Sequence, residues 1–100
     1  MVKLIALYKK PADVSAFESH YREIHVPLAK KMPGLKRIEL SHMTGSPGGE
    51  PKFYMMAELY FDDSAGMMAA LGSAEGKAAA KDVMSFAGDL IHMMFATVDG

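Results

Sequence analysis

The sequence predicts an α+β fold in which strands and helices follow one another in the order βαββαβ. Three observations predict it: four segments with the length and residue types of strands, an apolar stripe of helical spacing after the first segment, and an alanine-rich helical region before the last. One hundred residues suffice for a single hydrophobic core. We therefore expect one domain that covers residues 1–100.

The first strand and the helix that follows it give the clearest patterns. Residues 2–8 (VKLIALY) are almost all apolar, and Pro11 then ends the strand because proline cannot join a hydrogen-bond ladder. Asp13 is a good N-cap for the helix that follows, in which apolar residues recur three or four positions apart through Leu28. The sequence MPGL at 32–35 ends this helix, because proline and glycine are stop signals.

The second and third strands are predicted to form a hairpin. Residues 36–43 (KRIELSHM) alternate apolar and polar side chains, as a half-exposed strand does. The segment 45–51 (GSPGGEP) is rich in turn residues and connects them to the third strand, 52–61 (KFYMMAELYF).

A second helical region precedes the last strand. The residues DDS at 62–64 offer caps for a region that extends to about Gly88, and Gly72 and Gly76 are expected to break it into a short helix and a longer one. The last strand is predicted at 90–98 (LIHMMFATV).

This order is the ferredoxin-like arrangement, in which both helical regions cover one face of a four-stranded antiparallel sheet. Such a sheet normally alternates apolar and polar residues, because its other face meets water. The first, third and fourth strands are instead apolar on both faces. The bare face therefore needs a second cover, and we predict a homodimer packed sheet to sheet.

Composition excludes several classes of protein. The net charge is −1 and no block of like charges is present, which argues against binding to nucleic acid or a membrane surface. The third strand also lacks the basic-Gly-aromatic pattern of RNA-binding βαββαβ domains. No apolar run is long enough for a signal peptide or a membrane span, so we expect a cytoplasmic protein. Without cysteine, disulfides and thiolate chemistry are excluded.

The histidines show no metal-binding spacing. His20 and His25 are five residues apart and do not share a helical face, and Glu23 between them does not produce an H-E-x-x-H motif. A site would have to assemble in space from the following residues: His25, His42, His92 and Glu58. We expect no metal, and because nicotinamide and flavin motifs are also absent, we expect no cofactor.

His25 is the sharpest candidate for chemistry. It lies about 60° from the centre of the apolar stripe of its helix, where a histidine commonly caps a carbonyl or reaches solvent. Pro27 removes a donor to the carbonyl of Glu23 and pushes against it, so the helix should bend or loosen beside His25. A bent helix over a sheet leaves a cleft, and an imidazole at its edge can transfer protons near neutral pH.

The walls of this cleft are expected to be aromatic and sulfur-containing. The ten methionines are core-filling residues or line a pliable apolar pocket, and these two interpretations are compatible. The residues expected to contact a ligand are Phe17, Tyr21, Tyr60 and Phe86, with Glu58 or His92 as a possible partner of His25. The sequence does not determine which strand face lines the cleft.

Two segments resemble the EthD family, named for a component of ethyl tert-butyl ether degradation clusters. They are FESHYREIHVPLAKKMPGL at 17–35 and FDDSAGMMAALGSAEGKAAAKDVMSFA at 61–87, and the similarity extends over roughly residues 2–98. The resemblance implies a dimeric α+β barrel and distant relatives that include cyclases, isomerases, cofactor-free monooxygenases and haem-binding proteins. It matches His25 to a histidine of the first helix and Asp82 to an acid of the second helical region. At 82–86 the sequence reads DVMSF where the family often has D-x-P-N-F.

These observations support one leading hypothesis and two alternatives. The leading hypothesis is an enzyme, of a family often labelled oxidoreductase, that binds a small apolar or aromatic molecule between helices and sheet. His25 would act as a general acid or base in isomerisation, cyclisation, dehydration or cofactor-free oxygenation. The first alternative is a non-catalytic ligand-binding accessory to a degradation pathway. The second is a dimerisation domain with a closed core.

Overall fold

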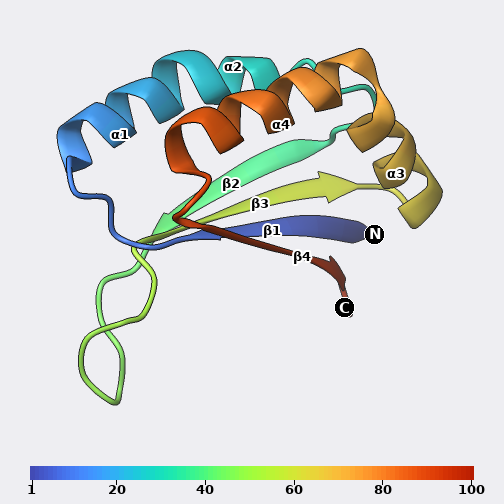
Figure 1. Cartoon of the computed structure of the whole chain (residues 1–100). Coiled ribbons are helices and arrows are strands. Elements are labelled where there is room, and N and C mark those ends of the chain that lie inside the picture. The colour runs from blue at the N-terminus through green and yellow to red at the C-terminus, as the bar shows by residue number, and fades with distance from the viewer.

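The computed structural model describes residues 1–100 and has a layer of helices on one face of a four-stranded antiparallel sheet (Figure 1). The strand order is β2-β3-β1-β4, and every neighbouring pair is antiparallel. This is the ferredoxin-like βαββαβ arrangement, so the predicted fold class is confirmed. The strands are β1 (Val2–Tyr8), β2 (Arg37–His42), β3 (Met55–Phe61) and β4 (Ile91–Thr97).

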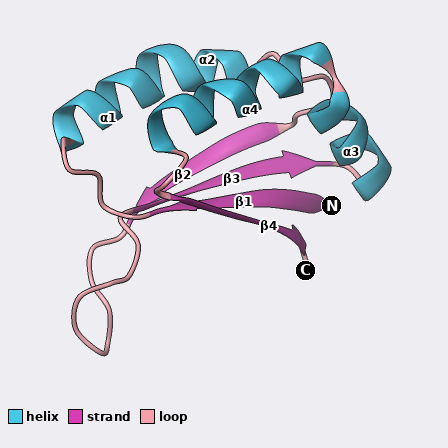
Figure 2. Ribbon diagram, in the orientation of Figure 1, coloured by secondary structure: helices cyan, strands magenta, loops and turns pink.

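The helices form two regions that lie side by side above the sheet (Figure 2). The first region comprises α1 (Val14–His20), the π-helical turn η1 (Tyr21–His25) and α2 (Val26–Ala29). The second comprises α3 (Ser64–Gly72) and α4 (Ala74–Ala87). None of these helices combines the length and the apolar character that crossing a bilayer requires.

Side-chain caps fix where the helices begin. The Asp13 carboxylate accepts a hydrogen bond from the Ala16 amide at 3.0 Å, and Asp63 caps α3 in the same way. Ser73 separates the two helices of the second region, because its hydroxyl accepts from the Gly76 amide at 3.0 Å and starts α4. The break therefore falls at one residue, and Gly76 lies inside α4 and not at its boundary as expected.

The first helical region loosens where the proline predicts it. Pro27 has no amide hydrogen, so the Glu23 carbonyl lacks its usual α-helical donor. In the same segment, the Val26 amide donates to the Tyr21 carbonyl five residues back, where a regular α-helix would use the carbonyl of Arg22. This longer hydrogen-bonded loop widens the turn η1. A widened turn of this kind occurs often at functional sites, and here it carries His25 at its end.

The core lies between the sheet and the helices. Leu4 of β1 pairs with Leu59 of β3, and Ala6 pairs with Ala57. All four are buried, and the rings of Phe17 and other residues of the first helical region cover them. One face of each central strand therefore forms the floor beneath the helices.

The β2–β3 connection extends away from the body of the molecule. Residues 43–54 form an extended loop with a bridge between Ser46 and Gly49 at its tip, and β3 begins at Met55 instead of residue 52 (Figure 1). The third strand is shorter than predicted because its neighbour β1 ends at Tyr8, which pairs with Met55.

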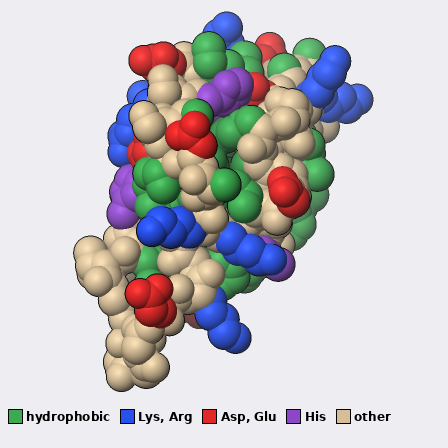
Figure 3. Space-filling model, turned by 60° about the vertical axis from the view of Figure 1, so that its left-hand side comes forward, with side chains coloured by type: hydrophobic (Ala, Val, Ile, Leu, Met, Phe, Trp, Pro, Cys, Tyr) green, Lys and Arg blue, Asp and Glu red, His purple; other side chains and the backbone are tan.

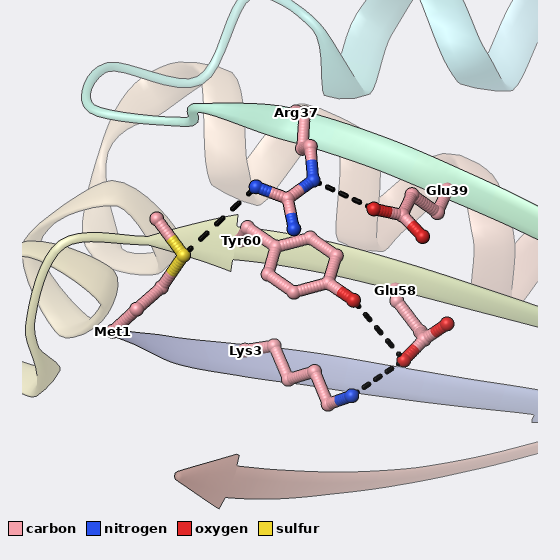
Figure 4. Close-up of polar contacts among 6 residues, drawn as sticks. All are labelled: Met1, Lys3, Arg37, Glu39, Glu58 and Tyr60. Carbon is pink, nitrogen blue, oxygen red and sulfur yellow. Dashed lines mark hydrogen bonds and ion pairs between the residues drawn. The ribbon is translucent and has the colours of Figure 1, made fainter. Parts of the chain in front are cut away.

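The bare face of the sheet combines apolar side chains with one polar cluster. Ile5, Leu7 and Met56 are only partly buried, and the edge strand β4 exposes large apolar side chains on both faces. Near one end, the Lys3 ammonium donates to Glu58 at 2.6 Å, and Arg37 lies over the Tyr60 ring at 3.8 Å (Figure 4). These side chains project from the face opposite the helices (Figure 4).

Charges are mixed on the part of the surface drawn in Figure 3. Acidic and basic side chains are interspersed there, and hydrophobic side chains are visible between them. With a net charge of −1, the chain as a whole lacks the excess of positive charge by which proteins attract nucleic acids.

Replacement of Gly76 by Ala should destabilise the protein. A Cβ at this buried position would overlap the Ala70 carbonyl oxygen and lie 2.7 Å from that of Leu71, both backbone atoms that cannot move aside easily. We expect a loss of roughly 1–3 kcal/mol in the free energy of unfolding, measured by urea denaturation. Gly72→Ala is the matched control, since nothing lies within 4 Å of its added Cβ. Equal stability of the two variants would contradict this packing.

Candidate functional site

An apolar cavity lies between the helical layer and the sheet. Its volume is about 90 Å³, and 15 of its 17 lining residues are hydrophobic. Leu4, Ala6, Ala57 and Leu59 form its floor, and residues of η1, α2 and α4 form its roof. It is smaller than the roughly 150 Å³ cavity that accommodates benzene. The site therefore suits a compact ligand or the end of a larger one.

Two methionines connect the cavity to the surface. Met84 of α4 and Met93 of β4 line it, and their side chains are 56% and 50% exposed. Methionine side chains repack readily because they are unbranched and flexible. The cavity therefore has a pliable mouth beside the edge strand, in agreement with the interpretation of the methionines as pocket residues.

His25 is the basic group of the cavity. Its side chain is 10% exposed, and its Nδ1 atom lies 3.0 Å from Oδ2 of Asp82 on α4. Because an ionised carboxylate only accepts hydrogen bonds, Nδ1 carries the hydrogen that is donated to Asp82. Nε2 makes no hydrogen bond within the protein, and no buried side-chain nitrogen lacks a partner, so Nε2 retains accessible surface.

The surroundings of His25 favour its neutral form. Burial lowers the pKa of His25 below its usual value of 6.5, and the hydrogen bond and charge of Asp82 offset only part of this effect. A neutral imidazole with its hydrogen on Nδ1 presents the lone pair of Nε2. His25 can therefore accept a proton inside an apolar cavity at neutral pH.

Two tyrosines complete the polar part of the site. Tyr8 of β1 and Tyr21 of η1 line the same cavity, and their rings meet edge to face with centroids 5.4 Å apart. Burial raises the pKa of Tyr21 to about 12, and burial also raises the pKa of Tyr8. Both phenols therefore remain protonated. The Tyr8 hydroxyl interacts with that of Tyr21, whose own hydrogen can be donated to an oxygen atom of a ligand.

Asp82 also binds a second histidine. Nε2 of His20 lies 2.9 Å from Oδ1 of Asp82, and the side chain of His20 is 34% exposed. The Phe86 ring packs against both imidazoles, with centroids 4.2 Å from His20 and 5.8 Å from His25. One carboxylate of α4 thus holds two imidazoles of the first helical region.

The structure places only some of the expected ligand-contacting residues at this cavity. Tyr21 lines it, as His25 does. Phe17 and Phe86 do not line it but pack against the Tyr21 ring, with centroids 5.7 and 6.3 Å away, and so support its position. Both also border a shallow groove on the outer surface.

Glu58, Tyr60 and His92 require a correction, because they lie on the other face of the sheet. Strand residues alternate between faces, and the register pairs Lys3 with Tyr60 on the bare face. Glu58 binds Lys3 there, and His92 packs against Phe53 with ring centroids 5.5 Å apart. None of the three expected residues can therefore act together with His25 within one protomer.

The histidines do not assemble a metal site. His42 is held by Glu18, whose Oε2 lies 2.8 Å from His42 Nε2, and is not among the residues that line the cavity. No group of three histidine, aspartate or glutamate side chains is arranged to hold a metal ion.

Residue patterns alone missed two members of the site. Asp82 was indicated only by the family resemblance, because its partners lie 57 and 62 residues away in the sequence. Tyr8 looked like an ordinary strand residue. Alternation along β1 places Tyr8 on the same face as Leu4 and Ala6, which would have identified it had the inward face been known.

Comparison with known proteins relates the chain to one family. The model of the EthD domain matches residues 9–89. An uncharacterised 11.0 kDa protein from the thcB-thcC intergenic region of Rhodococcus erythropolis is 38% identical over 95 residues, which cover 95% of this chain and 92% of that protein.

Solved structures agree with this relationship. An EthD family protein from Bacillus halodurans is 47% identical, with a TM-score of 0.95 and 99% of each chain covered. SnoaB, a cofactor-independent oxygenase from Streptomyces nogalater, shares the fold at 14% identity, with a TM-score of 0.73 and coverage of 99% of this chain and 93% of that chain. Other structures of this fold are dimeric ferredoxin-like proteins.

The stability of the protein should depend on pH through His25. Its pKa is lower in the folded state than the ordinary 6.5 of an unfolded chain, so the unfolded state binds more protons in the interval between the two values. The free energy of unfolding should therefore fall as the pH is lowered from about 7.5 to about 5.5, and level off once folded His25 is protonated. Urea denaturation across this range measures the slope.

The matched variant for this measurement is His25→Gln, which keeps a donor for Asp82 but does not titrate. It should lose this part of the slope, whereas His92→Gln on the other sheet face should keep it. An unchanged slope in His25→Gln would contradict a lowered pKa of His25.

Proposed function

The chain belongs to the EthD family, and we propose that it is a cofactor-free enzyme that binds a small apolar or aromatic compound and transfers a proton through His25. One observation carries the proposal: Asp82 holds His25 by Nδ1, while Nε2 makes no hydrogen bond within the protein and His25 lines an apolar cavity. A buried carboxylate behind an imidazole fixes its tautomer and stabilises the imidazolium ion that forms on proton uptake. This arrangement is what a general base requires.

The lining of the cavity supports a ligand with one polar group. Apolar side chains surround most of the space, and the exceptions are His25 and the hydroxyls of Tyr8 and Tyr21. We infer that the ligand carries a carbonyl or hydroxyl group which the tyrosines bind. The neighbouring C–H or O–H bond would then face Nε2 of His25.

The chemistry follows from these groups in order. Nε2 of His25 removes a proton from the ligand, and Asp82 balances the charge of the resulting imidazolium ion. The Tyr21 hydroxyl, backed by that of Tyr8, donates to the oxygen on which negative charge develops. The resulting enolate or phenolate is the starting point of isomerisation, cyclisation and cofactor-free oxygenation. The resemblance in fold to a cofactor-independent oxygenase is consistent with the last of these.

A ligand-binding accessory protein is the second candidate. The small volume of about 90 Å³ favours it, because a cavity of this size leaves little room for a second reactant. In that case His25 would accept a hydrogen bond from the ligand and no product would form.

We also propose that two chains pack through the bare faces of their sheets. The partly buried Ile5, Leu7 and Met56 and the exposed Met94 form an apolar surface there, which a soluble monomer rarely leaves uncovered. Proteins of the same fold described as dimeric are consistent with this arrangement.

Proton exchange of cyclopentanone tests the proposed function. It is an apolar carbon acid about as large as benzene, so its carbonyl end would enter the cavity while the rest of its ring lies in the mouth formed by Met84 and Met93. We expect the wild type to accelerate exchange of its α-protons with D₂O by at least roughly tenfold over His25→Gln, as a general base does. ¹H NMR measures the loss of signal, and His92→Gln serves as the matched control with wild-type rates.

Amide chemical shifts recorded with the same ketone separate the alternatives. Shifts at cavity residues without faster exchange would indicate the accessory protein. Neither shifts nor faster exchange would reject this cavity as a site for compact carbonyl compounds.

The proposed dimer is tested by light scattering at micromolar concentration. The wild type should show twice the mass of the chain. Leu7→Lys should weaken association at least tenfold, because it places a charge within the apolar contact. Ala78→Lys, on the exposed side of α4, should leave the mass unchanged. A wild-type protein with the mass of one chain would refute the dimer.

A further inference from the structure

Asp82 joins two imidazoles that differ in their access to solvent. Its two oxygens lie 2.9 Å from His20 and 3.0 Å from His25. The side chain of His25 is 10% exposed and faces the cavity, whereas that of His20 is 34% exposed at the surface. The two rings therefore share one carboxylate but lie in different environments, His25 at the apolar cavity and His20 at the solvent.

Few other charges lie at this cluster, and the nearest on the side of His20 are Asp13 and Asp89, which border the same surface groove. From β1 and η1, Tyr8 and Tyr21 face His25 and remain neutral. No lysine or arginine forms an ion pair with Asp82; in the same helical region, Arg22 pairs with Glu18. The two imidazoles are therefore the only cationic partners that Asp82 has.

One carboxylate carries one negative charge and can balance only one imidazolium ion. If both rings were protonated, one positive charge in this partly buried cluster would be uncompensated, and the two cations would repel each other. Protonation of either ring therefore opposes protonation of the other, and the two titrations are coupled.

We propose that His20 is a positioning residue that competes with His25 for Asp82, so that in mild acid the exposed ring takes the proton and His25 remains a free base. This inference rests on the proposed function, because it concerns how His25 is kept able to accept a proton from the ligand. The direction follows from solvent access: water stabilises a charge on His20, and the apolar cavity disfavours one on His25. Neutral His25 thereby persists to lower pH than it would if Asp82 had no second imidazole partner.

NMR titration of the histidine rings tests this competition in the full chain without ligand. In His20→Gln, the amide still donates to Asp82 but never becomes charged. We expect the midpoint of His25 to rise by about one pH unit, the size at which coupled groups titrate as a pair. His42→Gln, whose ring is bound to Glu18 instead, should leave the midpoint unchanged. An unchanged His25 midpoint in His20→Gln would overturn the proposal.

The wild type provides an independent reading should His20→Gln fold poorly. Its His25 titration should depart from a one-proton curve, since the ring responds to the charge on His20. Independent one-proton curves for both rings would overturn the proposal.

The outcome for the proposed function is separate from this one. A raised midpoint together with no exchange or binding of cyclopentanone would retain the competition and remove the function. Faster ketone exchange with an unchanged His25 midpoint would retain the proposed function and remove the competition.

Discussion

The Asp82 carboxylate is the interaction on which the site depends. It reaches from α4 to two imidazoles of the first helical region, and so links the two helical regions that cover the sheet. Its side chain is only 13% exposed, and a carboxylate so placed is costly unless it is hydrogen-bonded and paired. The same contacts that satisfy Asp82 also fix the tautomer of His25 and its place at the cavity. The same hydrogen bonds therefore stabilise the buried carboxylate and orient His25 for proton transfer.

The irregular helix belongs to the same arrangement. Pro27 prevents a regular α-helix, and the widened turn before it ends at His25. Local rules are broken most often where a protein has a function to perform, because strain or irregularity there is offset by contacts elsewhere. In this protein the aromatic rings of Phe17, Tyr21 and Phe86 pack around the turn, and Asp82 holds its last residue. The opposite face of the sheet carries apolar side chains together with His92 and the polar cluster of Lys3, Glu58, Tyr60 and Arg37.

Periodicity predicted the architecture well because each element has a strong local signal. Asp13, Pro11 and the stripe through Leu28 located the first helix, and Pro27 correctly indicated a loosened turn beside His25. The site was harder to predict because it is assembled across the fold. Glu58, Tyr60 and His92 were assigned to the cleft although they lie on the bare face, since a strand that is apolar on both sides does not reveal which side is covered. Asp82 and His25 are 57 residues apart in the sequence, so no helical or strand spacing indicates that they meet.

The central claim is that His25 offers an unprotonated Nε2 to the cavity while Nδ1–H is held by Asp82. Nitrogen-15 NMR of the histidine rings at about pH 7 tests it most directly, because the two ring nitrogens of each tautomer have distinct chemical shifts. We predict that His25 is neutral, with its hydrogen on Nδ1 and a bare Nε2. A ring with its hydrogen on Nε2, or an imidazolium ion at that pH, would contradict the account.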